Sequence, residues 1–193
     1  MVVSKTYRTI FIHVSKTGGT SIERMFPEKD RAKRKHMTAA ECVAKVGPEI
    51  WNDYFTMTVV RNPYDRLASY YCWRIAKPWG EEAKGRTFVE WLRHIRDVRG
   101  NLSHGHDFDR AVAQQYDHLA IDGELDFDFI GRFEDLEASF RKVAGVIGSS
   151  LGKTVHVNRN KHDHYTTLYN AESRSLIEEL YDKDLSHFGY GFE

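Results

Sequence analysis

A glycine-rich turn near the start of the sequence places the strongest constraint on the fold. The stretch HVSKTGGTS (13–21) follows the apolar run 10–12 and precedes residues 22–26, whose apolar side chains have helical spacing. A Gly-Gly pair allows positive φ and lets a ligand approach the main chain closely. The order of strand, tight turn and helix therefore predicts a βα unit with an anion bound where the helix begins.

Charged and hydroxyl side chains in this turn favour an anion over a purely structural turn. Lys16 adds a positive charge, and Thr17, Thr20 and Ser21 add hydroxyl groups. In the structural alternative, Thr20 and Glu23 form a capping box and the turn binds nothing. A turn without a ligand has little use for the lysine and the hydroxyls, so we expect an anion here.

The order of residues in this turn differs from that of a nucleoside-triphosphate P-loop. In that motif the lysine follows the glycines, whereas here Lys16 precedes Gly18 and Gly19. A second candidate, GKT at 152–154, has Ile147 where the motif needs its first glycine, and it follows an expected helix. Neither stretch is a Walker motif.

Strands and helices are expected to alternate along the chain. We expect strands over 7–14, 54–61 and 127–133, helices over 20–26, 39–46, 62–75, 88–95, 136–147 and 176–181, and loops over 99–109 and 158–169. This alternation predicts an α/β fold in one domain over 1–193, with a central, mostly parallel sheet flanked by helices and a P-loop-like turn. Ligands bind such sheets beyond the carboxyl ends of the strands.

Two of the expected helices carry clear start signals. Thr38 and Glu41 have the spacing of a capping box before the helix 39–46. Asn62 is placed as the N-cap of the next helix, with Pro63 at its first position.

A second anion-binding element is expected in VVRNPYDRLASYY (59–71). Arg61 falls at the carboxyl end of a strand, and its guanidinium suits a dianionic phosphate. Ser69 follows about two turns into the helix. In the structural alternative, Arg61 pairs with Asp65, and Ser69 is an ordinary helix serine that binds no ligand. Anion-binding elements at the ends of two strands suggest one ligand with phosphates at both ends.

Together, FIHVSKTGGTSIE (11–23) and VVRNPYDRLASYY resemble the paired signatures of sulfotransferases that use 3′-phosphoadenosine 5′-phosphosulfate (PAPS). The similarity is greatest to the carbohydrate-directed branch, which includes heparan sulfate 2-O-sulfotransferase-like proteins. IGRFEDL (130–136) and YDKDLSHFGYGF (181–192) also resemble that branch. One departure is Ser15, where the family usually has proline.

The resemblance implies a role for each matching residue. The residues implied to contact the phosphosulfate are Lys16, Thr17, Gly18, Gly19, Thr20 and Ser21. Arg61 and Ser69 are implied to bind the 3′-phosphate. The resemblance also implies a late loop over the nucleotide, for which Arg159, Lys161 and Tyr165 are the candidates.

Transfer of a sulfuryl group requires a base for the acceptor hydroxyl and donors for the departing phosphate. His36 is the candidate base, because it precedes the capped helix and aligns with the segment that carries the proposed base in the resembled branch. The alternative is that His36 belongs to the solvated run RAKRKH (31–36). Lys16 is the candidate acid toward the leaving group, and His13 is expected to be a strand histidine near the site.

No metal is expected, because the family needs none. The pairs His104/His106 and His162/His164 lack a third ligand at a recognisable spacing.

The composition indicates the cellular location and the classes of partner that we expect. Lysine plus arginine balance aspartate plus glutamate at 28 each, so we expect no nucleic-acid partner. Two cysteines indicate a reduced, cytoplasmic setting, and no apolar run approaches the ~20 residues of a membrane span. The expected acceptor is a hydroxyl of a carbohydrate or small metabolite. A nucleotide-sensing or anion-binding module without catalysis and a kinase-like nucleotide enzyme remain the alternatives, and the oligomeric state is open.

Overall fold

The computed structural model describes residues 1–33, 36–78, 80–99, 106–148 and 164–193. These residues belong to two compact units. The first unit takes its residues from Met1–Arg61 and Gln115–Asn158, and the second takes its residues from Asn62–Gln114 and Arg159–Glu193. The chain therefore leaves the first unit after Arg61 and re-enters it at Gln115.

The first unit holds a four-stranded sheet in the order β1-β2-β3-β4. Its strands are β1 (Val2–Ser4), β2 (Thr9–Ile12), β3 (Phe55–Val60) and β4 (Phe129–Arg132). β1 pairs with β2 in antiparallel fashion, whereas β2, β3 and β4 run parallel. The mostly parallel sheet flanked by helices confirms the expected α/β class.

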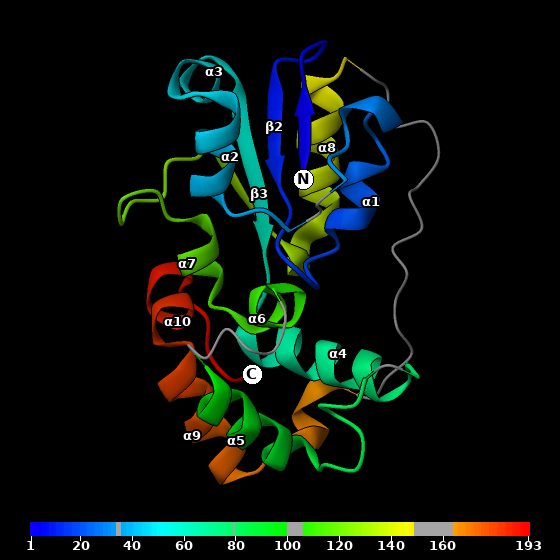
Figure 1. Cartoon of the computed structure of the whole chain (residues 1–193), viewed down its shortest axis with the longest axis vertical. Coiled ribbons are helices and arrows are strands. Elements are labelled where there is room, and N and C mark those ends of the chain that lie inside the picture. Colours follow the sequence, from blue (N-terminus) through cyan, green and yellow to red (C-terminus); the bar gives the residue numbers. More distant parts are fainter. Residues whose placement is uncertain (34–35, 79, 100–105, 149–163) are drawn as a thin grey trace. The chain divides into compact units, whose positions relative to one another are not determined.

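Helices cover both faces of this sheet. The helices of the first unit are α1 (Gly19–Glu23), η1 (Glu28–Asp30), α2 (Ala39–Val46), α3 (Pro48–Asp53), α7 (Gln115–Leu119), η3 (Phe133–Asp135) and α8 (Leu136–Val146). Figure 1 shows α1 and α8 on one side of the sheet and α2 and α3 on the other.

Alternation along the strands explains how the first core forms. Successive side chains of a strand point to opposite faces, so Met57 and Val59 of β3 share a face with Phe11 of β2. These three side chains are fully buried in a cluster with Ile22 of α1 and Phe140 of α8. The core thus fixes the strand and the helix on either side of the glycine-rich turn.

The second unit is helical in its described residues. It consists of α4 (Pro63–Ile75), α5 (Phe88–Val98), α6 (His106–Val112), η4 (Tyr165–Leu168), α9 (Ala171–Leu180) and α10 (Asp182–Phe188). The four apolar positions that predicted α5 are all buried: Phe88, Trp91, Leu92 and Ile95. They pack in one core with apolar side chains of α4, α6 and α9.

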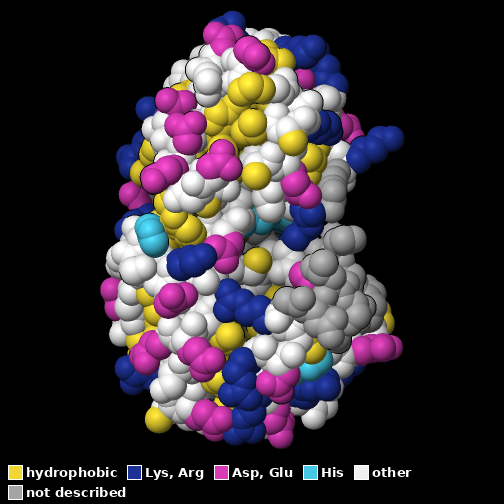
Figure 2. Space-filling view, turned by 60° about the vertical axis from the view of Figure 1, so that its left-hand side comes forward, with side chains coloured by type: hydrophobic (Ala, Val, Ile, Leu, Met, Phe, Trp, Pro, Cys, Tyr) yellow, Lys and Arg dark blue, Asp and Glu magenta, His cyan; other side chains and the backbone are white. Residues whose placement is uncertain are grey.

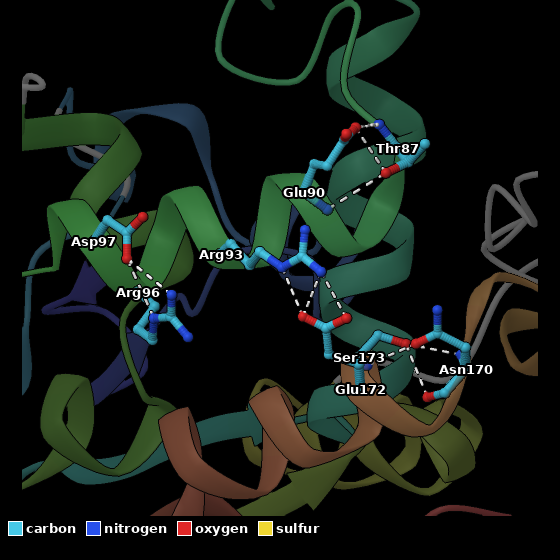
Figure 3. Close-up of polar contacts among 8 residues, drawn as sticks. All are labelled: Thr87, Glu90, Arg93, Arg96, Asp97, Asn170, Glu172 and Ser173. Atoms are coloured by element: carbon cyan, nitrogen blue, oxygen red, sulfur yellow. Dashed lines mark hydrogen bonds and ion pairs between the residues drawn. The ribbon is translucent and has the colours of Figure 1, made fainter.

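Polar contacts at the surface of the second unit join α5 to α9 (Figure 3). The guanidinium of Arg93 donates to both carboxylate oxygens of Glu172, each at 2.6 Å. Figure 3 also shows capping interactions at the start of α5, between Thr87 and Glu90, and at the start of α9. These contacts set where the two helices begin and how they are aligned.

Both predicted helix-start signals are confirmed. The Thr38 hydroxyl accepts from the Glu41 N–H at 3.1 Å, and the Glu41 carboxylate accepts from the Thr38 N–H at 2.9 Å. The Asn62 side chain accepts from the Tyr64 N–H at 3.1 Å, and Pro63 is the first residue of α4.

Several expectations for the loops were wrong. Residues 106–109 begin α6 and do not form a loop, because Phe108, Ala111 and Val112 bury one face of that helix. Polar and charged residues surround Phe108 in the sequence, so the apolar spacing of this helix is not evident there. Part of the expected loop 158–169 forms η4, and α3, α7 and α10 were not expected. The expected strands are shorter in the structure than in the sequence-based prediction.

Charges of both signs are interspersed on the face shown in Figure 2. This distribution agrees with the balanced composition. Within the described residues, no helix combines the length and the apolar character that a membrane crossing requires.

Replacing Thr38 with alanine should lower the free energy of unfolding by about 1 kcal/mol, because the hydroxyl that caps α2 is lost. Urea unfolding followed by circular dichroism measures this change. As a comparison, Arg93→Gln should have the smaller effect, because Arg93 and Glu172 are about half exposed, at 44% and 49%. A larger loss for Arg93→Gln would contradict this ranking.

Candidate active site

The glycine-rich turn is tightly folded between the end of β2 and the start of α1. Lys16 has a φ of 67° and Gly18 a φ of 78°, both in the left-handed region. For a lysine this conformation costs about 1–2 kcal/mol, so the surrounding contacts must hold it. One such contact is internal, because the Thr17 hydroxyl donates to the Val14 carbonyl at 2.9 Å.

Packing requires the glycine at position 19, and the positive φ favours the glycine at position 18. A Cβ at Gly19 would clash with the imidazole of His13. A Cβ at Gly18 would lie 2.8 Å from Leu136 Cδ2, in addition to the positive φ. The Gly-Gly pair is therefore explained by the turn itself, and the anion prediction rests on Lys16 and the hydroxyls.

The hydroxyls of the turn differ in their surroundings. Thr17 is fully buried and its hydroxyl hydrogen is donated within the turn, so any contact from Thr17 to an anion would come from its main-chain N–H. Thr20 is exposed and Ser21 half-buried. The predicted alternative of a capping box between Thr20 and Glu23 is wrong, because Gly18 is the N-cap of α1 and caps it without a side-chain bond.

His13 is a buried, neutral histidine directly before the turn. The residue is 4% exposed, and its Nδ1 lies 3.0 Å from Glu23 Oε1. Burial lowers the pKa of His13 to about 4 despite this carboxylate. Burial acts to raise the pKa of Glu23, but the contact with His13 and nearby positive charge outweigh it and lower that pKa to about 2. At neutral pH the pair therefore consists of an imidazole and a carboxylate.

His36 lies against His13 although the two are far apart in the sequence. Its Nδ1 is 3.0 Å from the His13 carbonyl oxygen, and the two rings meet edge to face with centroids 4.7 Å apart. A carbonyl only accepts, so His36 Nδ1 carries the proton and, in the neutral ring, the lone pair is on Nε2. The predicted base thus lies beside the predicted anion-binding turn in a tautomer that suits proton removal.

Arg61 contacts the same turn from the end of β3. The residue is 6% exposed, and its Nη1 donates to the Lys16 carbonyl oxygen at 2.9 Å. The guanidinium carbon lies 3.9 Å from the centre of the Phe133 ring, a cation–π stacking distance. The sequence-based prediction placed Arg61 at a strand end but did not foresee its bond to Lys16.

Gln115 is a further residue at this site that the sequence reasoning missed. Its side-chain amide accepts from the Arg61 N–H at 2.9 Å and donates to the Arg61 carbonyl at 2.8 Å. Gln115 is fully buried at the first position of α7. It belongs to neither motif, and a single glutamine far along the chain gives no local signal of such a contact.

The remaining predicted residues belong to the second unit or lie outside the described residues. Ser69 is buried on α4, and its joint role with Arg61 stays a prediction. Tyr165 packs in the helical core, and its hydroxyl donates to the Glu193 carbonyl at 2.8 Å. This contact gives Tyr165 a structural role, and its binding to a nucleotide stays a prediction. Arg159 and Lys161 lie outside the described residues, as does GKT at 152–154.

Among the described residues, histidine, cysteine and acidic side chains form no group of three that fits a metal ion. His104 and His162, one member of each histidine pair considered in the sequence, lie outside them.

Comparison with known proteins identifies the class of this chain. Residues 1–191 match the model of the sulfotransferase family, and the chain therefore belongs to that family. A solved structure of a sulfotransferase from Alicyclobacillus acidocaldarius is similar, with a TM-score of 0.51, 14% identity and 96% of each chain covered. At this identity the structural likeness shows the fold. No curated protein matches the chain. Family membership indicates an enzyme that transfers sulfate.

The buried His13 should make the protein less stable in acid. Its pKa is lower in the folded than in the unfolded chain, so its contribution is complete above about pH 6.5 and is lost as pH falls toward 4. The variant His13→Asn keeps an N–H donor but does not titrate. Between about pH 7 and pH 5, urea unfolding should show a steeper loss of stability in the parent than in this variant.

The carboxylate of Glu23 titrates below this range, so it does not obscure the comparison. Equal pH dependence in the parent and in His13→Asn would show that His13 is not buried as a neutral group.

Proposed function

We propose that this sulfotransferase moves a sulfuryl group from PAPS to an acceptor hydroxyl, with a carbohydrate or small metabolite as the expected acceptor. One observation carries the proposal: three predicted residues meet at one turn. Lys16 lies in the turn, and its main-chain carbonyl accepts a hydrogen bond from Arg61. The main-chain carbonyl of His13, at the start of the turn, accepts a hydrogen bond from His36. A lysine in the turn, with an arginine and a candidate base bonded to its main chain, suits a donor with an anionic leaving group.

In this proposal the turn binds the phosphosulfate end of the donor. Lys16 supplies positive charge, the main chain at Gly18, Gly19 and Thr20 supplies N–H groups, and the hydroxyls of Thr20 and Ser21 supply further donors. Amides at the start of a helix have no acceptor within the helix, so those of Gly19 and Thr20 suit an anion. Arg61 and Ser69 bind the 3′-phosphate, and Arg159, Lys161 and Tyr165 are the remaining candidates for contacts to the nucleotide.

Catalysis requires a base for the acceptor hydroxyl and a positive charge beside the leaving group, and the chain has a candidate residue for each. His36 Nε2 accepts the proton of the acceptor hydroxyl as its oxygen bonds to sulfur. The bond between sulfur and the phosphate oxygen breaks, and the ammonium of Lys16 stabilises the negative charge on that oxygen. His13 stays neutral beside His36, so it does not oppose the positive charge that His36 gains.

Two further features concern the charge of the acceptor and the cellular location of the reaction. Lys29 and Lys33 are exposed in the basic segment that leads to His36, which suits an acceptor with negative charge. Cys42 is buried and Cys72 is half-buried, and a reducing, cytoplasmic setting stays part of the proposal.

Adenosine 3′,5′-bisphosphate should bind without added metal and at least roughly tenfold more tightly than AMP, because the 3′-phosphate gains a charge-assisted contact. Isothermal titration calorimetry with and without EDTA measures this binding, and ATP serves as the competing ligand. Tighter binding of ATP, or loss of binding in EDTA, would show that the donor assignment is wrong.

Replacing His36 with alanine should lower kcat by about 10²–10⁴-fold. Affinity for adenosine 3′,5′-bisphosphate should stay nearly unchanged, because the imidazole serves the acceptor and not the nucleotide. The assay follows sulfate transfer from PAPS to a panel of carbohydrates. A matched control is His187→Ala, which removes an exposed histidine on α10 and should leave kcat unchanged.

The tautomer of His36 gives a second test that needs no acceptor. Nitrogen-15 NMR of the parent protein should show the proton of the neutral His36 ring on Nδ1. Full activity in His36→Ala, or a proton on Nε2, would exclude His36 as the base in this geometry.

A further inference from the structure

The guanidinium of Arg61 joins the two donor-binding motifs. Arg61 belongs to the second motif, and its Nη1 donates to the carbonyl of Lys16 in the first motif at 2.9 Å. Lys16 is also the residue of the turn that holds a left-handed conformation without being glycine. A charge-assisted bond to its carbonyl fixes the peptide that follows Lys16, and with it the start of the turn.

Arg61 is itself held from two sides. The ring of Phe133 stacks against the guanidinium, with 3.9 Å between the guanidinium carbon and the ring centre. The amide of Gln115 bonds to both the N–H and the carbonyl of Arg61. The Gln115 amide therefore bonds to the main chain of Arg61 as a neighbouring strand would, one residue beyond the end of β3. These two bonds fix the direction in which the Arg61 side chain leaves the main chain.

We propose that Gln115, Arg61 and the Lys16 carbonyl form a brace that couples the two ends of the donor site. In this brace Gln115 is a positioning residue, and Arg61 shapes the phosphosulfate turn in addition to binding the 3′-phosphate. The inference rests on the proposed function for the identity of the ligand. The contacts that define the brace lie within the first unit.

The brace predicts an effect on ligand binding that a phosphate contact alone does not. A guanidinium has several N–H donors in a planar fork, so one can bind the Lys16 carbonyl while others bind a phosphate. If Arg61 only bound the 3′-phosphate, its loss would not affect ligands that lack this group. If Arg61 also shapes the turn, its loss weakens the binding of both kinds of ligand.

The test compares two ligands on three variants. Adenosine 3′,5′-bisphosphate carries the 3′-phosphate, and adenosine 5′-phosphosulfate lacks it. Arg61→Lys keeps the charge but loses the planar fork, Gln115→Met removes both bonds to Arg61 at similar size, and Gln114→Met is the matched control. Gln114 is also a buried glutamine, but its amide accepts from Lys183 in the second unit.

For Arg61→Lys and Gln115→Met, calorimetry should show a loss of roughly tenfold in affinity for both ligands. Gln114→Met should bind both ligands as the parent does. A loss confined to adenosine 3′,5′-bisphosphate in Arg61→Lys, or parental affinity in Gln115→Met, would overturn the brace. Should Gln115→Met fail to fold, Arg61→Lys still decides, because it leaves the buried amide in place.

Amide hydrogen exchange separates the brace from the proposed function. In the ligand-free protein, Gln115→Met should speed exchange in the turn 14–20 while the amides of β2 and β3 keep their protection. Faster exchange throughout the sheet would indicate general destabilisation and would overturn the positioning role. If the parent bound neither ligand, the proposed function would fail, and the exchange pattern would still decide on the brace.

Discussion

The parallel pairing of β2 with β3 is the constraint on which the site depends. Ile12 lies opposite Thr58 in this pairing, so the two strands end at the same edge of the sheet. The turn that follows β2 and the arginine that follows β3 must therefore be neighbours. The hydrogen bond from Arg61 to Lys16 is the direct result, and antiparallel pairing would have placed the two motifs at opposite edges.

The sequence predicted those parts of the molecule that depend on neighbouring residues. The Thr38 cap, the Asn62–Pro63 start of α4 and the buried stripe of α5 are local patterns of hydrogen bonding and apolar spacing, and the structure confirms them. Helix α6 was missed because its apolar positions are separated by charged residues. Gln115 was missed because its partner, Arg61, is distant along the chain and no local pattern reports such a contact.

The turn shows how one residue type can satisfy two physical demands. Its glycines resemble a nucleotide-binding signature, yet the His13 ring already leaves no room for a side chain at Gly19, and the positive φ of Gly18 already favours glycine. The Thr17 hydroxyl likewise donates its hydrogen within the turn and not to a ligand. Sequence reasoning assigned these residues to an anion because ligand contacts and internal packing select the same small or hydroxylated side chains. Lys16 is different, because close packing does not select a long, charged side chain.

The bond between Gln115 and Arg61 also bears on how such a protein can change over evolutionary time. The chain leaves the first unit directly after Arg61 and returns at Gln115, so these two residues close the segment Asn62–Gln114 at its base. The entropy of closing a long segment depends only weakly on its length. Insertions or deletions in the loops of this segment therefore leave its anchored ends in place, and the helical segment can diversify without rebuilding the sheet edge that holds the turn.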